Sequence, residues 1–337
     1  MVISRWIRVA AATLGLLGAS QSHAALTLTA DGITLGFSIS TFATVFPGNT
    51  GCCSGPFGVA MDTTGGSNTV VVSVNGTRYQ FADTDGQTTG TALNTTGSGS
   101  GTNAYATAGG LAYGGEGGNF VQFNKNGTVN HVLTGVNTSP YLGMWGNPVN
   151  GHIIATSFAG LIDIDPLANS GAGSYRVING AFGDGVSVSP DGTIAFLETG
   201  GITSYNIATG AVIQSFSDAL LSAVDGTGVI SSTNSLNGDI VAVTNNGTVV
   251  LIDPDAPGGP TYTLIASGGT RGDYASPDVS NGTLFIDTAD IVYRLACGPD
   301  CGIGVAPPPP IPEPETYALM LAGLAAMGAV ARRRRRT

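Results

Sequence analysis

The sequence predicts an all-β fold, a six-bladed β-propeller, and three observations carry this prediction. Glycine supplies 52 of 337 residues, and only 10% of the residues are charged, a composition that disfavours helices and favours short strands with tight turns. A unit of strand, turn and apolar strand recurs through the second half of the chain. Its turns lie 41 to 46 residues apart, which is the length of a propeller blade.

The first 24 residues have the order of a secretory signal peptide. Arg5 and Arg8 precede an apolar run over residues 9–19, and the small residue Ala24 ends the segment. The apolar run is shorter than the roughly 20 residues that span a bilayer. We therefore expect export with cleavage after Ala24, the alternative being an uncleaved anchor.

The body of the chain is strongly acidic. Residues 25–303 carry 20 acidic and five basic side chains, a net charge of −15. A nucleic acid needs a basic face on its partner, so we expect no nucleic-acid binding. The length of this body is compatible with one propeller domain, because propellers of this size need not divide into smaller domains.

The recurring turns define the predicted blades. Gly151, Gly192, Gly238 and Gly282 close the first hairpin of successive units, and apolar strands such as TIAFLE, DIVAVT and TLFIDT follow three of these turns. Asn-Gly and Asp-Gly are frequent in these hairpins because such turns need positive φ, which these residues adopt at little cost. Six blades fit the spacing best, with five or seven as alternatives.

Two earlier segments fit the repeat less regularly. GGLAY (109–113) is expected to contribute an inner strand, since small side chains fit near a crowded axis, and residues 88–110 as a whole are predicted to form an exposed, low-complexity insertion. PFGVAMDTTGGSNTVVVSVNGTRYQF (56–81) resembles a blade of the NHL-repeat and gluconolactonase-like propellers. The residues that carry this resemblance are Pro56, Gly58, Val59, Ala60, Asp62, Arg78 and Phe81. The resemblance supports the fold rather than an activity.

A propeller must close its ring, and the last unit supplies only three strands before Cys297. The segment GITLGFSISTFATVF (32–46) alternates like a strand. We expect it to complete the last blade and so remove an open sheet edge. The alternative is a loosely attached N-terminal strand.

The four cysteines flank this proposed seam. Cys52 and Cys53 follow the N-terminal strand, and Cys297 and Cys301 follow the last blade. Disulfides are expected in an exported protein. Because adjacent cysteines bond each other only with strain, we expect the bridges to cross the seam, in either of two connectivities. Metal binding is the lesser alternative, since this spacing is not a usual zinc pattern.

The body contains little material for common hydrolytic sites. After signal removal, only His131 and His152 remain, far apart in the sequence, so no catalytic residue is assigned. The resemblance to gluconolactonase-like enzymes implies a divalent cation, such as Ca²⁺, in the central channel. The weak candidates for its ligands are Asp184, Asp273 and Asp278, although Asp at a strand end is more often a turn residue.

The C-terminal region departs from the propeller pattern. Residues 304–311 form a Pro-rich linker, and residues 312–337 contain Pro-Glu-Pro, a short apolar helix over 317–331, and an arginine cluster. The helix is a short membrane span before the arginines. This order is similar to the PEP-CTERM sorting signal of Gram-negative, exopolysaccharide-producing bacteria. The matching residues are Pro312, Glu313, Pro314, Arg332, Arg333, Arg334, Arg335 and Arg336.

The PEP-CTERM resemblance implies recognition by an exosortase, a membrane enzyme that cuts near Pro-Glu-Pro and passes the body onward. We therefore expect an inner-membrane intermediate followed by a cell-surface or extracellular-matrix location. The expected role is a non-catalytic binding or structural protein associated with exopolysaccharide, with a glycan or a surface protein as its ligand. The alternative is a secreted, metal-dependent lactonase-like or lyase-like enzyme.

Overall fold

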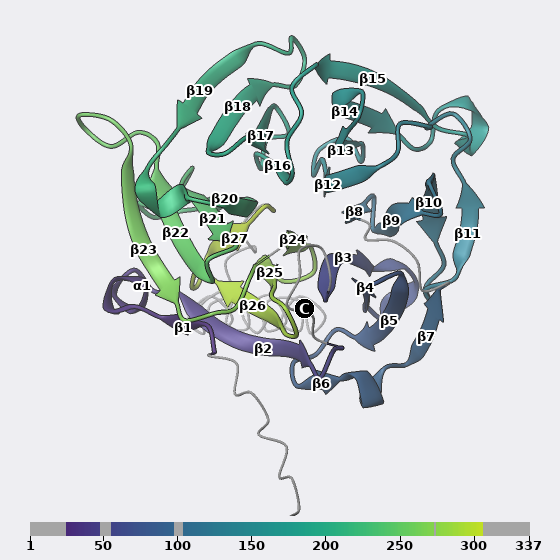
Figure 1. The fold of residues 1–337 in the computed structure, drawn as a ribbon, viewed down its shortest axis with the longest axis horizontal. Helices are drawn as coiled ribbons and strands as arrows, with labels where there is room; N and C mark the ends of the chain where they lie inside the picture. The colour runs from purple at the N-terminus through teal and green to yellow at the C-terminus, as the bar shows by residue number, and fades with distance from the viewer. Residues whose placement is uncertain (1–24, 48–54, 98–103, 273, 306–337) are drawn as a thin grey trace, which may run out of the picture.

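The computed structural model describes residues 25–47, 55–97, 104–272 and 274–305, which form six β-sheets arranged around a common axis (Figure 1). Each sheet contains a run of antiparallel strands, with the first strand nearest the axis and the last at the rim. The predicted six-bladed β-propeller is confirmed.

The blades follow the chain in order. Blade 1 contains β3 (Pro56–Asp62), β4 (Thr69–Val74), β5 (Thr77–Ala82) and β7 (Asn94–Gly97). Blade 2 contains β8 (Tyr105–Ala108), β9 (Leu111–Glu116), β10 (Asn119–Phe123) and β11 (Val129–Val132). Blade 3 contains β12 (Tyr141–Gly146), β13 (Ile153–Ser157), β14 (Gly160–Asp165) and β15 (Ser174–Asn179).

The last three blades complete the ring. Blade 4 contains β16 (Val186–Val188), β17 (Ile194–Glu198), β18 (Ile202–Asn206) and β19 (Val212–Phe216). Blade 5 contains β20 (Val224–Ser232), β21 (Ile240–Thr244), β22 (Thr248–Asp253) and β23 (Thr261–Ser267), with β1 (Thr27–Leu28) and β27 (Cys301–Ile303) at its edges. Blade 6 contains β24 (Tyr274–Asp278), β25 (Thr283–Asp287), β26 (Val292–Ala296), β2 (Ser38–Thr44) and β6 (Gln87–Thr88).

The helical segments of the described residues are short. They are α1 (Ala30–Thr34) and the 3₁₀ turns η1 (Thr64–Gly66), η2 (Thr89–Thr91), η3 (Asn169–Gly171) and η4 (Ala219–Leu221). Within the described ranges, no helix has both the length and the apolar character needed to cross a membrane.

The ring is closed by the N-terminal strand, as predicted. β2 runs antiparallel to β26, with Ser38 opposite Ala296 and Ile39 opposite Leu295, so blade 6 takes its fourth strand from the other end of the chain. The expected strand began at residue 32, but residues 30–34 form α1 instead. The Thr29 hydroxyl accepts a hydrogen bond from the Gly32 amide and begins this helix.

The four glycine turns of the repeat also occur where the sequence places them. Gly151, Gly192, Gly238 and Gly282 each lie between the first and second strands of a blade, with φ values of 74°, 72°, 92° and 76°. Residues with a side chain rarely adopt this left-handed region, so glycine at these positions allows the hairpin to turn without strain.

The prediction for residues 88–110 is wrong. Residues 94–97 form the outer strand of blade 1 and residues 105–108 the inner strand of blade 2. GGLAY therefore starts in the first hairpin of blade 2 and continues into its second strand rather than forming the inner one. The strand at 94–97 is short and polar, and the strand at 105–108 is short and built mainly from small residues, so neither showed a clear alternating apolar pattern.

The hydrophobic core lies between neighbouring blades. Alternate side chains of β4 point to opposite faces of blade 1, so Val70 packs with Phe42 and Phe285 from blade 6 while Val71 packs with Tyr105 from blade 2. Every residue of β4 is buried. Strands of this kind are apolar on both faces because each blade is covered on both sides.

Candidate functional site

The inner strands of the six blades all run in the same direction along the axis. Four antiparallel strands return the chain to the face on which a blade begins, so each blade starts on the same side of the ring. We call the face on which inner strands begin the entry face, with Asp184 and Asp225 beside it, and the opposite one the exit face, with Val149 and Val279 beside it. Candidate residues can share a site only if they lie on the same face.

The axis between these faces is filled by side chains. The Tyr274 hydroxyl of blade 6 lies 2.6 Å from the Tyr105 carbonyl oxygen of blade 2 and 2.7 Å from the Met144 carbonyl oxygen of blade 3. Burial raises the pKa of this hydroxyl, which therefore stays neutral. Trp145 is also fully buried. The Tyr274 side chain therefore reaches across the ring from blade 6 to blades 2 and 3.

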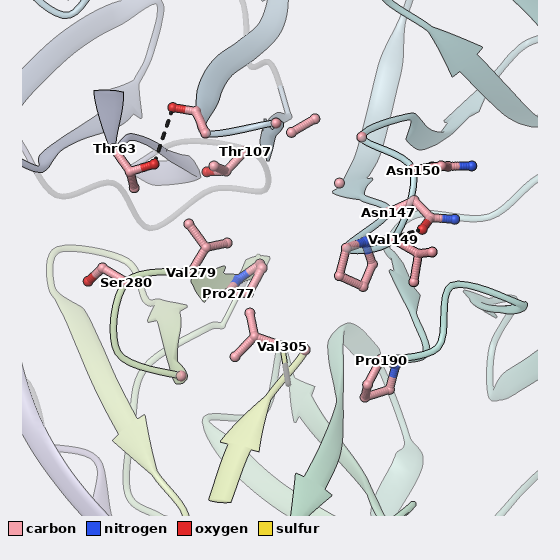
Figure 2. A pocket seen from close by; sticks show the side chains of 18 of the residues that line it. Thr63, Thr107, Asn147, Val149, Asn150, Pro190, Pro277, Val279, Ser280 and Val305 are labelled. Atoms are coloured by element: carbon pink, nitrogen blue, oxygen red, sulfur yellow. Dashed lines mark hydrogen bonds between the residues drawn. The ribbon is translucent and has the colours of Figure 1, made fainter. Parts of the chain in front are cut away.

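A cavity of about 910 Å³ lies at the exit face and is here called the axial cavity. Turns from five blades and the end of the described chain surround it (Figure 2). Its lining consists of glycine, proline, alanine, valine, threonine, serine and asparagine, and none of the lining residues is charged. The side chains around the opening include Thr63, Thr107, Asn147, Val149, Asn150, Pro190, Pro277, Val279, Ser280 and Val305.

Hydrogen bonds fix the asparagine turn on one side of the axial cavity. Asn147 donates through Nδ2 to the Gly192 carbonyl at 2.9 Å and accepts the Val149 amide at 3.0 Å. The Asn150 side-chain oxygen accepts the His152 amide at 2.9 Å. Val149 remains 67% exposed beside these amides. The cavity thus presents apolar faces next to neutral hydrogen-bonding groups, an arrangement that suits an uncharged polar ligand.

Asp278, one of the predicted cation ligands, belongs to an ion-pair network. Its carboxylate lies 2.8 Å from the Arg294 guanidinium, and the Ser280 and Asn281 side chains donate hydrogen bonds to it. Burial raises the pKa of Asp278, and the nearby Asp83 adds to this effect, while Arg294 opposes it. An arginine already supplies the positive charge that a cation would bring.

Asp184 lies at the entry face, just before β16. Burial raises the pKa of Asp184, and a hydrogen bond shared with Asp225 opposes that rise. The inner strands all run in the same direction. Asp184 comes just before β16, whereas Asp278 is the last residue of β24, so the two residues lie at opposite ends of the axis. These two carboxylates therefore cannot bind the same cation. Asp273, the third candidate, lies outside the described residues.

Glu198 beside Asp184 is the buried acid that the sequence did not single out as a site residue. It is 2% exposed, and neither carboxyl oxygen has a hydrogen bond of normal geometry to another described residue. Burial raises the pKa of Glu198 to about 8, with the Asp184 charge as a further contribution. A Cβ at Gly185 would lie 1.8 Å from Glu198 Oε2, so glycine is needed there. The sequence signal was the rarity of glutamate in the body, where only Glu116 and Glu198 occur.

The acids of the described residues do not form a metal cluster. Within the described ranges, no group of three or more His, Cys, Asp or Glu side chains has the arrangement needed to hold a metal ion. Asp184 and Asp278 therefore do not form one shared site for the cation that the sequence resemblance implies.

The cysteine prediction is wrong in its pairing. Cys297 and Cys301 form a disulfide with each other, with their Cα atoms 5.7 Å apart. A tight turn after β26 leads into β27 and brings these two residues together. Cys52 and Cys53 lie outside the described residues, as do the predicted cleavage site at Ala24 and the sorting residues from Pro312 onward.

Comparison with known proteins identifies the C-terminal segment and supports the fold. Residues 310–336 match the PEP-CTERM protein-sorting motif. A comparison with curated proteins found no match. Among solved structures, a gluconolactonase from Xanthomonas campestris is similar with 16% identity and a TM-score of 0.50, over 75% of this chain and 88% of that one. An auxiliary nutrient binding protein from Bacteroides thetaiotaomicron has 10% identity and a TM-score of 0.49, over 77% and 76%.

These findings define the class of the protein. It is an exported β-propeller protein that carries a PEP-CTERM sorting motif, which marks it for processing by an exosortase through a membrane-anchored intermediate. The structural neighbours are too distant in sequence to transfer an activity, so they support the propeller fold alone.

Proposed function

We propose that this protein is a non-catalytic binding protein of the cell surface or extracellular matrix, associated with exopolysaccharide. The axial cavity is its ligand site, and the ligand is an uncharged glycan. The observation that carries this proposal is the lining of the cavity, which combines neutral amides and hydroxyls with proline and valine faces and contains no charged residue.

Charge supports a neutral ligand over an anionic one. The body carries a net charge of −15, so a polymer of uronates meets a repulsive field at long range. A neutral sugar is insensitive to this field and can use its hydroxyls on the asparagine and threonine groups around the cavity. The other expected kind of ligand is a surface protein, and by the same reasoning it would bind through an exposed, uncharged loop.

Binding to defined oligosaccharides tests the proposal. We expect at least one of maltohexaose, cellohexaose and chitohexaose to bind the purified, detergent-solubilised chain in isothermal titration, and an alginate hexamer to bind more weakly. Val149→Asp places a charge in the cavity and weakens binding at least tenfold. Phe158→Ser is the matched control, because Phe158 lies on the opposite face and is 76% exposed. No binding by any neutral sugar, or equal binding by Val149→Asp, would contradict the proposal.

A second candidate function is a metal-dependent lactonase-like or lyase-like enzyme that acts at the entry face. Glu198 favours it, because a buried acid with a strongly raised pKa beside a second carboxyl group is frequent in active sites. Calcium titration of the purified chain tests this candidate: stoichiometric binding that is lost in both Asp184→Asn and Glu198→Gln supports it. If the purified chain binds no calcium, the calcium-dependent form of this candidate function is contradicted.

A further inference from the structure

The described chain ends inside the axial cavity. β27 pairs antiparallel with the last residues of β20, with Ile303 opposite Ile230, and this pairing carries the chain inward from blade 5. The Gly304 amide then donates a hydrogen bond to the Val229 carbonyl oxygen at 2.6 Å. Gly304 and Val305 both line the cavity, and Figure 2 shows the Val305 side chain among the other lining groups. The residues that follow therefore start within the cavity.

Gly304 holds this end of the chain in place. A Cβ at this position would lie 2.2 Å from Cζ2 of Trp145 in blade 3 and 3.2 Å from Cβ of Pro277 in blade 6. Its φ is +72°, which also favours glycine. The chain thus passes between two blades that face each other across the axis. Its direction is fixed by packing on both sides up to the last described residue.

The residues that come next match the cavity in chemistry. They are Ala306 and four consecutive prolines, Pro307–Pro310. Proline has no backbone N–H, so burying this segment leaves few donors unsatisfied. The cavity offers the apolar faces of three prolines and two exposed valines, and it carries no charge that an apolar segment would have to desolvate.

The cost of ordering this segment is small. Four prolines already favour an extended polyproline helix, so little backbone entropy remains to be lost on docking. The segment is also covalently attached at Val305, so its effective concentration at the cavity is in the range of about millimolar or above. A cavity of about 910 Å³ lies in the upper part of the range that encloses small ligands, and it can hold several residues.

We propose that Ala306–Pro310 dock in the axial cavity and compete there with any external ligand. The docking itself does not depend on the proposed glycan, whereas the competition rests on the proposed function of the same cavity. Docking also brings the Pro-Glu-Pro of the sorting motif, which starts at Pro312 only two residues later, close to the exit face. The exit face then lies toward the membrane in the anchored intermediate, and the entry face points away.

Cysteine cross-linking tests the docking. The full chain is prepared with Pro308→Cys combined with Val149→Cys, oxidised mildly, and mapped by mass spectrometry without reduction. We expect a disulfide between the two new cysteines, because docking brings their Cα atoms within the roughly 7 Å that a disulfide allows. The matched control pairs Pro308→Cys with Asn234→Cys, which is exposed on the exit face outside the cavity.

The control separates docking from random contact of a tethered chain. Docking predicts a cross-link yield at Val149 at least tenfold above that at Asn234. It also predicts that replacing the other three prolines by serine lowers the Val149 yield. Equal yields at the two positions, or a Val149 yield that does not change with the serine replacements, would overturn the docking.

A binding measurement tests the competition. With Pro307–Pro310 replaced by serine, the affinity for the neutral hexasaccharide that binds the original chain should rise by about threefold or more. An unchanged affinity together with a strong Val149 cross-link contradicts the competition but leaves the docking in place. If no sugar binds either chain, the proposed function fails, and the cross-link still decides whether the linker docks.

Discussion

Arg294 is the side chain on which three carboxylates of the described fold converge. It forms ion pairs with Asp83, Asp85 and Asp278, and its guanidinium lies 4.9 Å from the ring centres of both Phe42 and Phe285. Its side chain is only 10% exposed, and Asp278 is fully buried. One arginine therefore pairs with carboxylates of blade 6 and of the loop after β5 in blade 1 while it packs against the closing strand.

Removal of Arg294 should be strongly destabilising. Arg294→Met keeps much of the apolar contact but leaves Asp278 and Asp83 buried without their cation, which costs about 3 to 5 kcal/mol of unfolding free energy. Arg176→Met is the matched control. The Arg176 side chain is 48% exposed, and its partner Asp163 also contacts His152, so this loss should stay below about 1 kcal/mol. Urea unfolding measures both, and similar losses in the two variants would contradict this account.

Glu198 predicts an unusual dependence of stability on pH. Its pKa is about 8 in the folded protein, against about 4.5 in the unfolded chain. The folded state therefore holds a proton that the unfolded chain releases between these values. This contribution is fully present below pH 4.5 and is lost as the pH rises through 8, with a total on the order of 4 kcal/mol.

Glu198→Gln should remove most of this pH dependence, since the amide cannot ionise. Chemical unfolding at intervals from pH 4.5 to pH 8.5 measures the effect. Asp239→Asn is the control: burial and the charges of Asp253 and Asp255 raise the pKa of Asp239 to about 6, so this variant affects only the lower part of the range. A steep loss of stability above pH 6 that persists in Glu198→Gln would show that another group is responsible.

At the scale of elements, pairing between distant segments closes the fold. β2 joins β26 across more than 250 residues of sequence, and β1 joins β23 in blade 5 in the same way. Phe42 of β2 is fully buried against Phe81 and Phe285, so it links the closing strand to blades 1 and 6. The closure of the ring therefore rests on backbone pairing and aromatic packing.

The disulfide contributes little to this closure. Cys297 and Cys301 are four residues apart, so their bond restricts a short loop and stabilises the fold by about 2 kcal/mol in the chain-entropy model. A bridge across the seam would have given about 5.5 kcal/mol in the same model. Cys297→Ser with Cys301→Ser should thus lower the free energy of unfolding by about 2 kcal/mol and leave the far-ultraviolet circular dichroism unchanged. A loss of 4 kcal/mol or more would contradict the local role of this bond.

The sequence predictions were correct for features that depend on neighbouring residues and failed for features that depend on distant parts of the chain. The glycine turns and the alternating closing strand were predictable because hairpin geometry and the two-residue period of a strand depend on neighbouring residues. The strands at 94–97 and 105–108 were not, because each has only four residues and its pairing depends on adjacent strands rather than on a pattern of its own. The cysteine pairing failed because the turn after β26, rather than the nearness of the two chain ends, decides which sulfurs meet.

The candidate site was less predictable than the fold. Asp184 and Asp278 are both near inner strands, as expected, but the direction of those strands places them at opposite ends of a filled axis. The axial cavity is built from turn residues of several blades, and no motif in the sequence brings them together. Glycine, proline and asparagine are common in turns for conformational reasons, so their presence in the sequence does not indicate that several turns form one binding surface.

At the scale of the whole molecule, the two faces of the ring differ in their relation to the sorting segment. The entry face holds the buried acids Asp184 and Glu198, and the exit face holds the uncharged cavity from which the chain leaves toward residues 310–336. Sorting therefore acts on a segment attached at one defined face. The segment and the propeller should consequently behave as separable parts, since the described ring closes without any residue beyond Val305.

Replacement of Pro312, Glu313 and Pro314 by alanine tests this separation. We expect export to depend on the predicted N-terminal signal peptide, and the described fold closes without the motif, so the triple variant should cross the inner membrane and keep the melting temperature of the unchanged protein. Without the motif, exosortase processing should fail and the body should remain in the inner-membrane fraction with its arginine cluster attached. Fractionation with C-terminal mass spectrometry measures both results.

Arg176→Ala is the control for this prediction. Arg176 lies on a rim strand far in sequence from the motif, so this variant should be processed normally. Release of the triple variant with its arginines removed would show that recognition does not depend on Pro-Glu-Pro, whereas loss of the folded body would show that the motif contributes to the propeller.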